Sequence, residues 1–188
     1  MSRREFGVSH EIFGLDTERI LQTLAEHRVE YVLVGGLAAL AHGSTLATAD
    51  ADLVPRPDAA NLERLLDALE ALGGQVLVSE RRQAMESGEP WGVAELRRGA
   101  DGLTSAPAWH LTTSAGPVDV VMDAAGVGTY DAHLDAAVDR EAFGVVIRVA
   151  GLADLIASKR ALGRPKDQAI LRELIDLDER APDHPDPN

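Results

Sequence analysis

Hydrophobic positions recur along this chain at two spacings, one typical of helices and one typical of buried strands. The helical spacing of three or four residues predicts helices over residues 16–28, 37–42, 58–72, 130–138, 152–162 and 166–177. Short apolar runs rich in valine predict strands over residues 31–34, 50–54, 75–78, 109–113, 118–122, 140–143 and 145–149. Helices and strands do not alternate strictly, so the pattern favours an α+β fold in which helices flank a mixed sheet.

The order of these elements divides the chain into a core and a helical end. We expect residues 1–150 to form the core and residues 151–180 to form C-terminal helices that pack on it. Residues 181–188 read APDHPDPN and are expected to form a flexible tail, because a proline-rich polar segment has nothing to bury. The length of 188 residues suits this plan of one domain with an appended helical end.

Charge and composition exclude several classes of protein. Asp and Glu number 31 against 18 Lys and Arg, a net charge of −13, which argues against general DNA binding because such binding depends on neutralising phosphates. Cysteine is absent, which excludes disulfides, thiolate metal sites and a cysteine nucleophile. Apolar stretches such as Tyr31–Ala41 are too short to span a membrane, and no apolar signal core follows the N-terminal arginines. We therefore expect a cytoplasmic protein with no membrane partner.

Three aspartates are the first candidates for chemistry. Asp50 and Asp52 lie two residues apart on a predicted strand, so both carboxylates face one side of it, about 7 Å apart at the Cα atoms. Asp119 lies in an otherwise apolar predicted strand and completes a triad if that strand is a neighbour. Clustered carboxylates repel one another unless cations lie between them, and oxygen ligands suit Mg²⁺ or Mn²⁺. Two such ions about 4 Å apart can clamp the oxygens of a phosphoryl transfer.

Two aspartates at this spacing also occur in unrelated classes of protein. Haloacid-dehalogenase-like phosphatases place such a pair at the end of an early apolar strand, but the run before Asp50, Ser44–Thr48, is not such a strand. Glycosyltransferases use a similar pair, and aspartates can simply lie exposed on edge strands. The pair alone does not decide between these classes.

Gly35 and Gly36 strengthen the case for a phosphate substrate. They follow the predicted strand over residues 31–34 and precede the short predicted helix over residues 37–42. A strand, two glycines and a helix can bring a phosphate close to backbone N–H groups at the start of the helix. The alternative is a tight turn between strand and helix, with no ligand.

The combination resembles the signature of DNA polymerase β-type nucleotidyltransferases. The segment Val32–Val54 reads VLVGGLAALAHGSTLATADADLV, which is similar to the apolar-Gly-Gly/Ser element and the following Asp-x-Asp of that superfamily. Asp50, Asp52 and Asp119 occupy the places of its three aspartates. Gly36 stands where many members have serine, so a serine contact to the nucleotide phosphate is missing. Within the superfamily the chain most resembles AbiEii/MenT-like toxins.

A second segment, Leu152–Asp167, supports the resemblance and carries positive charge. It reads LADLIASKRALGRPKD and is similar to a run near the C-terminus of those toxins. Lys159, Arg160, Arg164 and Lys166 form a basic cluster within it, and a triphosphate needs cationic partners in addition to its metal ions. The alternative is that Lys159 and Arg160 compensate the dipole at the end of a helix.

The resemblance implies a nucleotidyltransferase core that transfers NMP from an NTP to a hydroxyl acceptor and releases pyrophosphate. Asp50, Asp52 and Asp119 would bind Mg²⁺ or Mn²⁺ and carry catalysis, while Gly35 and Gly36 join the basic cluster in holding the NTP. The acceptor expected from the toxins is a tRNA 3′ end or a protein, and the expected partner is a cognate antitoxin. Two alternatives stay open: a small-molecule nucleotidyltransferase of the aminoglycoside type, and a nucleotide-binding module without catalysis.

Overall fold

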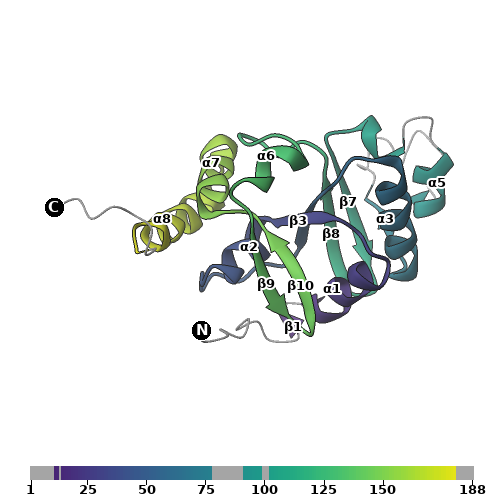
Figure 1. Cartoon of the computed structure of the whole chain (residues 1–188), viewed down its shortest axis with the longest axis horizontal. Helices are drawn as coiled ribbons and strands as arrows, with labels where there is room; N and C mark the ends of the chain where they lie inside the picture. The colour runs from purple at the N-terminus through teal and green to yellow at the C-terminus, as the bar shows by residue number, and fades with distance from the viewer. Residues whose placement is uncertain (1–10, 13, 78–90, 99–101, 181–188) are drawn as a thin grey trace.

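The computed structural model describes residues 11–12, 14–77, 91–98 and 102–180, and the expected tail over residues 181–188 lies outside them. The described chain forms one large sheet with helices on both sides (Figure 1). Within the described part, no helix combines the length and the hydrophobicity needed to cross a bilayer.

The main sheet mixes parallel and antiparallel strands, as the sequence predicts. Its eight strands run in the order β6 (Trp91–Gly92), β5 (Gln75–Val76), β7 (Ala108–Thr113), β8 (Gly116–Val121), β4 (Ala51–Pro55), β3 (Tyr31–Val34), β10 (Val145–Val149) and β9 (Val138–Ala142). The pairs β4–β8 and β3–β10 are parallel and the other neighbours are antiparallel. A small separate sheet joins β1 (Glu11–Ile12) to β2 (Leu15–Asp16). The predicted α+β fold with a mixed sheet is thus confirmed.

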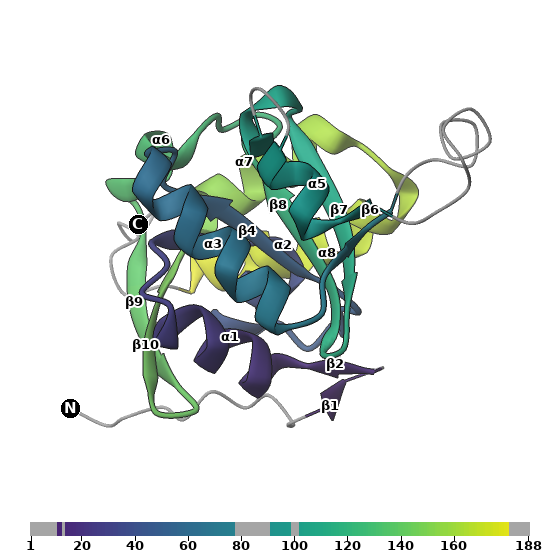
Figure 2. The same cartoon turned by 90° about the vertical axis from the view of Figure 1, so that its right-hand side faces the viewer.

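Helices cover the two faces of the sheet. In Figure 2, α1 (Thr17–Glu26) and α3 (Ala59–Ala71) lie in front of the sheet and α8 (Pro165–Glu179) lies behind it. On the side of α8, α7 (Leu152–Leu162) contacts both α8 and α2 (Gly35–Ala41). All four residues of β3 are buried between the layers, which explains why this strand is apolar on both faces. The shorter elements are α5 (Val93–Arg98), a 3₁₀ turn (Gly102–Ser105) and α6 (Tyr130–Leu134).

Side-chain caps and apolar stripes account for where the helices begin and end. Asp16 and Asp58 each accept a hydrogen bond from a backbone N–H three residues on, at 3.0 Å, and so begin α1 and α3. Gly163, at φ +60°, ends α7 in the left-handed conformation that glycine tolerates. The side chain of His133 is buried, and a hydrogen bond of 3.0 Å between its Nδ1 and Asp154 ties α6 to α7.

Several predicted boundaries differ from the structure by one to four residues, and in two cases a specific contact outweighs the local pattern. The helix predicted over residues 130–138 ends at Leu134, because Val138 begins β9 and pairs with Val149 of β10. The strand predicted to include Asp50 starts one residue later, at Ala51. Asp50 lies in a bend, where its carboxylate accepts a hydrogen bond from the hydroxyl of Thr48 at 2.8 Å.

Candidate active site

A row of polar side chains crosses the middle of the sheet on the face of α2 and α7. In the register of the strands, Asp52 of β4 stands opposite Asp119 of β8, and Asp119 stands opposite His110 of β7. Directly opposed residues point to the same face of a sheet. The neighbours of Asp52 along its strand, Ala51 and Leu53, are fully buried on the other face. Strand pairing therefore brings together Asp52 and Asp119, which are far apart in the sequence.

Asp50 reaches the same place from the end of the preceding loop. It is half-buried and lies two residues before Asp52. The hydroxyl of Thr48 donates a hydrogen bond to Oδ1 of Asp50 at 2.8 Å, and the negative charge of Asp50 raises the pKa of Asp52. The three predicted aspartates are thus adjacent, although Asp50 belongs to a bend and not to the strand.

The carboxylate of Asp52 carries the electrostatic stress of this arrangement. Burial, followed by the negative charges of Asp50 and Asp119, raises its pKa from 3.8 to about 6. The charge of Lys159 and a hydrogen bond from the N–H of Gly36 act in the opposite direction. Because like charges repel and burial disfavours the charged form, this site gains from a cation among its carboxylates.

Gly35 and Gly36 allow the backbone of α2 to approach these carboxylates closely. A Cβ atom on Gly35 would stand 1.8 Å from Oδ2 of Asp52, and Gly35 has φ +65°. A Cβ atom on Gly36 would stand 2.4 Å from the hydroxyl oxygen of Thr48, which in turn holds Asp50. Both glycines therefore position carboxylates, and the predicted contact of this pair with nucleotide phosphates stays a prediction.

The predicted basic cluster faces the carboxylates through Lys159 and Arg164, and the side chain of its fourth member, Lys166, lies outside the part that the structure describes. The side chain of Lys159 in α7 is 13% exposed, and its Nζ lies 3.3 Å from Oδ1 of Asp167. Its positive charge lowers the pKa of Asp52. Arg164 donates a hydrogen bond to Oδ2 of Asp167 at 2.7 Å. The negative charges of Asp52 and Asp50 contribute to the raised pKa of Arg164. Arg160 is exposed, as expected for the neighbour of an inward-facing residue on a helix.

Asp167 is the anion that organises this basic cluster. Its side chain is 3% exposed and contacts Lys159 and Arg164. The hydrogen bond from Arg164, followed by the contacts with Lys159, lowers the pKa of Asp167 to about 2. Asp167 is therefore ionised at neutral pH and holds two cations near Asp52 and Asp50.

The donor chemistry of the site fits a divalent metal ion. Among the residues that the structure describes, no three His, Cys, Asp or Glu side chains stand as a ready metal-binding group. Asp50, Asp52 and Asp119 nevertheless supply carboxylate oxygens, the ligands that Mg²⁺ and Mn²⁺ prefer. Burial and the neighbouring charges of Asp50 and Asp119 raise the pKa of Asp52, and a cation among these carboxylates would relieve both effects. The fit thus rests on the kind of ligand and on this electrostatic environment.

Sequence reasoning did not assign two residues that position the site. His110 contacts Asp119, but only the register of the hairpin β7–β8 reveals the pair. Glu173 of α8 accepts hydrogen bonds from the hydroxyl of Ser44 at 2.7 Å and from the N–H of Thr45 at 2.7 Å. Glu173 thereby fixes the loop that leads to Thr48, and nothing local in the sequence indicates that contact.

Comparison with known proteins supports the fold. No family model and no curated protein sequence matches the chain. Among solved structures, the crystal structure of the lincosamide antibiotic adenylyltransferase LnuA with lincomycin bound is similar, with a TM-score of 0.54 and 13% identity over 87% of this chain and 98% of that chain. The solution structure of the antibiotic-resistance factor ANT(2'')-Ia gives a TM-score of 0.47 and 15% identity over 86% of this chain and 79% of that chain.

These comparisons support the predicted nucleotidyltransferase fold but do not test the closer resemblance to one group of toxins. The likeness to LnuA extends over nearly the whole of that enzyme, so it concerns the architecture and not one shared motif. The closer similarity to AbiEii/MenT-like toxins stays a prediction. The chain has the fold of the adenylyltransferase LnuA, while membership of the DNA polymerase β-type superfamily stays a prediction. In this fold Asp119 pairs in register with Asp52, and Asp50 lies two residues before Asp52.

Proposed function

We propose that this protein is a metal-dependent nucleotidyltransferase that transfers NMP from an NTP to a hydroxyl group of a small, positively charged molecule. The observation that carries the proposal is the placement of Asp52 opposite Asp119, with Asp50 beside them and the cations Lys159 and Arg164 facing them. Carboxylates for metal ions and cations for phosphates, side by side, are what a phosphoryl transfer requires.

In the proposed reaction, each group of residues has its own task. The acceptor oxygen attacks the α-phosphorus, the bond from that phosphorus to the bridging oxygen breaks, and pyrophosphate leaves with the bonding electrons. Asp119 takes the proton of the acceptor hydroxyl, while Lys159 and Arg164 bind the oxygens of the leaving pyrophosphate. Mg²⁺ or Mn²⁺ bound by Asp50, Asp52 and Asp119 would supply positive charge against the charge that develops on the phosphate oxygens.

Three observations support a small cationic acceptor. The net charge of −13 disfavours a polyanion and attracts a cation. Aromatic residues make up only 4% of the chain, which leaves little surface on which RNA bases could stack. The similar structure of LnuA holds lincomycin, a small molecule, and that enzyme is an antibiotic adenylyltransferase. Together they favour a small molecule over a nucleic acid.

A second candidate follows from the sequence resemblance to AbiEii/MenT-like toxins. In that case the acceptor is a tRNA 3′ end or a protein, and a cognate antitoxin restrains the activity. The segment Leu152–Asp167 is the feature that favours it. The chemistry at Asp50, Asp52 and Asp119 is the same in both candidates, so only the acceptor distinguishes them.

Both candidates can be tested in one set of reactions. The protein is incubated with Mg²⁺ and each α-³²P-labelled NTP, together with a panel of aminoglycosides and lincosamides, with total tRNA, or with no acceptor. We expect label on a small molecule, and loss of that label in Asp50→Asn and Asp52→Asn but not in Asp139→Asn, an exposed aspartate of β9. Label on tRNA or on the protein supports the second candidate, and no label anywhere favours a nucleotide-binding module.

A further inference from the structure

The loop that joins α2 to β4, residues 42–50, is held near its start by a residue of the C-terminal helix. The N–H of Ser44 donates to the carbonyl of Ala39 in α2 at 3.0 Å, which ties the loop to the end of that helix. Ser44 is buried, so its hydroxyl needs a hydrogen-bond partner inside the protein. That partner is Glu173 of α8, a residue far away in the sequence.

Both carboxylate oxygens of Glu173 accept hydrogen bonds from this loop. Oε2 accepts from the hydroxyl of Ser44 at 2.7 Å, and Oε1 accepts from the N–H and the hydroxyl of Thr45 at 2.7 Å and 2.9 Å. The bond from Ser44, together with those from Thr45, lowers the pKa of Glu173 although burial opposes it. The carboxylate is therefore ionised at neutral pH and acts only as an acceptor, which fixes the direction of all three bonds.

The other end of the same loop holds a carboxylate of the site. The hydroxyl of Thr48 donates to Oδ1 of Asp50 at 2.8 Å. Thr48 also packs against the start of α2, where a Cβ atom on Gly36 would stand 2.4 Å from its hydroxyl oxygen. The residues between Thr45 and Thr48 have no regular secondary structure, so the contacts at the two ends set the path of the loop.

We infer that Glu173 is a positioning residue for the proposed metal site, because it holds the loop through which Thr48 places the carboxylate of Asp50. The inference rests on the proposed function, since it concerns the same site. Groups that orient a metal-binding carboxylate commonly change metal affinity or activity about 10- to 100-fold when they are lost. Glu173 acts through the loop and not on Asp50 itself, so we expect an effect at the lower end of this range.

Two simpler roles for Glu173 make different predictions. If its bonds only stabilise the fold, their loss lowers the melting temperature and leaves the metal affinity of the folded protein unchanged. If only its negative charge matters, by attracting cations to this side of the molecule, every substitution that removes the charge weakens metal binding equally. The positioning role requires instead that metal affinity follows the hydrogen bonds.

Substitutions that differ in hydrogen bonding separate these roles. Glu173→Gln removes the charge but keeps an oxygen that accepts from Thr45, and its amide N–H can donate to the oxygen of Ser44. Glu173→Leu removes the charge and all three bonds. Glu179→Leu is the control, because Glu179 is an exposed residue of the same helix. Ser44→Ala breaks the contact from the side of the loop and replaces Glu173→Leu in the test if that variant does not fold.

The first measurement is the binding of Mn²⁺ to the full chain without nucleotide, followed by electron paramagnetic resonance well below the melting temperature of each variant. We expect Glu173→Leu to bind Mn²⁺ about tenfold more weakly than the wild type, and Glu173→Gln and Glu179→Leu to stay within about threefold. In transfer assays, Glu173→Leu should raise the Mg²⁺ concentration at half-maximal rate about tenfold. The KM for the NTP at saturating Mg²⁺ should change little, because Asp167 holds the cations Lys159 and Arg164 separately.

The outcomes distinguish failure of this inference from failure of the proposed function. Wild-type Mn²⁺ affinity in Glu173→Leu, or in Ser44→Ala where it replaces that variant, overturns the inference. Equal weakening in Glu173→Gln and Glu173→Leu also overturns it, because the charge alone would then explain the effect. A wild-type protein that binds Mn²⁺ but transfers no NMP to any acceptor contradicts the proposed function, and Mn²⁺ binding by the variants still decides the inference. A wild-type protein that binds no Mn²⁺ overturns both.

Discussion

Gly35 adjoins Asp52 so closely that a Cβ atom on the glycine would stand 1.8 Å from Oδ2 of the carboxylate. The backbone N–H of the next residue, Gly36, acts on the same carboxylate and lowers its pKa. The start of α2 and the middle of the site are therefore one packed unit, in which the glycine is required for both its space and its φ of +65°.

The first prediction follows from this packing. In Gly35→Ala, the new methyl group must displace Asp52, and a non-glycine residue at this φ adds strain, so we expect NMP transfer to fall at least 100-fold. Gly144→Ala is the control, since Gly144 has φ +78° but no atom within 4 Å of the added carbon. It should lose about 1 kcal/mol of stability from the backbone alone and keep its activity. Wild-type transfer by Gly35→Ala would contradict the role given to this contact.

The second prediction concerns the stability of the metal-free protein. The pKa of Asp52 is about 6 in the folded state against 3.8 for the unperturbed group. Ionisation of Asp52 thus destabilises the fold; the effect is complete above about pH 6 and disappears below about pH 4. Asp52→Asn removes it while keeping the volume of the side chain. We expect this variant to gain roughly 1–3 kcal/mol of unfolding free energy at pH 7.5.

Urea unfolding without divalent ions, at pH 7.5 and at pH 4, measures this gain. The gain should shrink towards zero at the lower pH. Its pH dependence is expected to follow Asp52 and its charged neighbours Asp50, Asp119, Lys159 and Arg164. Asp139→Asn, which loses an exposed ion pair with Arg148, should show no gain at either pH. If Asp52→Asn were no more stable than the wild type at pH 7.5, the electrostatic stress would be absent.

The sequence predicts this fold and site well where the signals are local. The helix ends are examples: α1 and α3 begin at the capping residues Asp16 and Asp58, and α7 ends at Gly163, which has no side chain to oppose the left-handed conformation. Asp52 is recognisable because a charged residue interrupts an apolar strand. The alternation along that strand also gives the face on which it lies.

Other features depend on contacts between distant segments, which no local pattern encodes. Val138 reads as the end of a helix, but the hairpin with β10 gives it a strand partner. Asp50 reads as part of a strand, but Thr48 holds its carboxylate and bends the chain. The pair of His110 with Asp119 exists only through strand register, and the two-residue turn Ser114–Ala115 between the strands does not by itself reveal which residues face each other.

The third prediction tests the anion that holds the basic cluster. The pKa of Asp167 is about 2 in the folded state against 3.8 for the unperturbed group, mainly because Arg164 donates to it and Lys159 lies beside it. Asp167 therefore stabilises the fold above about pH 4, and this stabilisation is lost as the pH falls towards 2. We expect Asp167→Asn to lose about 2 kcal/mol at pH 7 and less at pH 3.

The control for this prediction is a second aspartate of the same helix. Asp176 of α8 is exposed, so Asp176→Asn should change the unfolding free energy by less than about 0.5 kcal/mol at either pH. Chemical denaturation followed by circular dichroism gives both values. Equal losses in the two variants, or a loss in Asp167→Asn that does not vary with pH, would show that the ion pairs do not stabilise the fold.

The fourth prediction separates stability from activity at Asn61. This fully buried side chain of α3 donates to the carbonyls of Glu30 at 2.7 Å and Arg56 at 2.9 Å, and its oxygen accepts from the N–H of Glu30 at 2.7 Å. Asn61→Ala removes the side-chain partner of the N–H of Glu30 and of the carbonyl of Arg56, and leaves the carbonyl of Glu30 with the N–H of Arg56 alone, so we expect a loss of roughly 2–4 kcal/mol. Glu63→Ala, which removes an exposed partner of Arg97, should lose less than about 1 kcal/mol.

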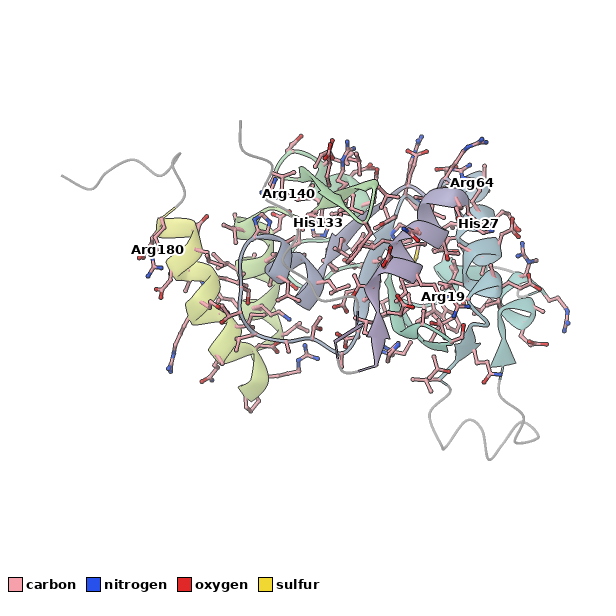
Figure 3. The ribbon with its side chains drawn as sticks, turned by 90° about the horizontal axis from the view of Figure 1, so that it is seen from below. Arg19, His27, Arg64, His133, Arg140 and Arg180 are labelled. Atoms are coloured by element: carbon pink, nitrogen blue, oxygen red, sulfur yellow. The ribbon has the colours of Figure 1, made fainter. Side chains whose placement is uncertain are left out.

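The hydrogen bonds of Asn61 lie on the face of the sheet that α1 and α3 cover, whereas the carboxylates lie on the opposite face, so activity should survive the substitution. Arg64 extends it by donating to the Asn61 oxygen at 3.0 Å and to the carbonyl of Arg28 at 3.0 Å, and Figure 3 shows Arg64 beside His27 at the end of α1. Transfer per folded molecule of Asn61→Ala, measured well below its melting temperature, should match the wild type. A large loss in kcat at unchanged stability would instead tie Asn61 to the site.

The last prediction compares the adjacent cations Lys159 and Arg160. Lys159 faces inward, where it lies 3.3 Å from Asp167 and its charge reaches Asp52. Lys159→Ala should therefore weaken NTP binding about 10- to 100-fold, as expected for the loss of a bond to a charged phosphate, and it should also lose about 1–2 kcal/mol of stability because Asp167 keeps only Arg164. Arg160 is exposed near the end of α7, so Arg160→Ala should lose a few tenths of a kcal/mol through the helix dipole and bind NTP normally. Calorimetric titration with NTP and thermal unfolding of both variants decide the matter, since normal NTP affinity in Lys159→Ala would leave this lysine with a purely structural role.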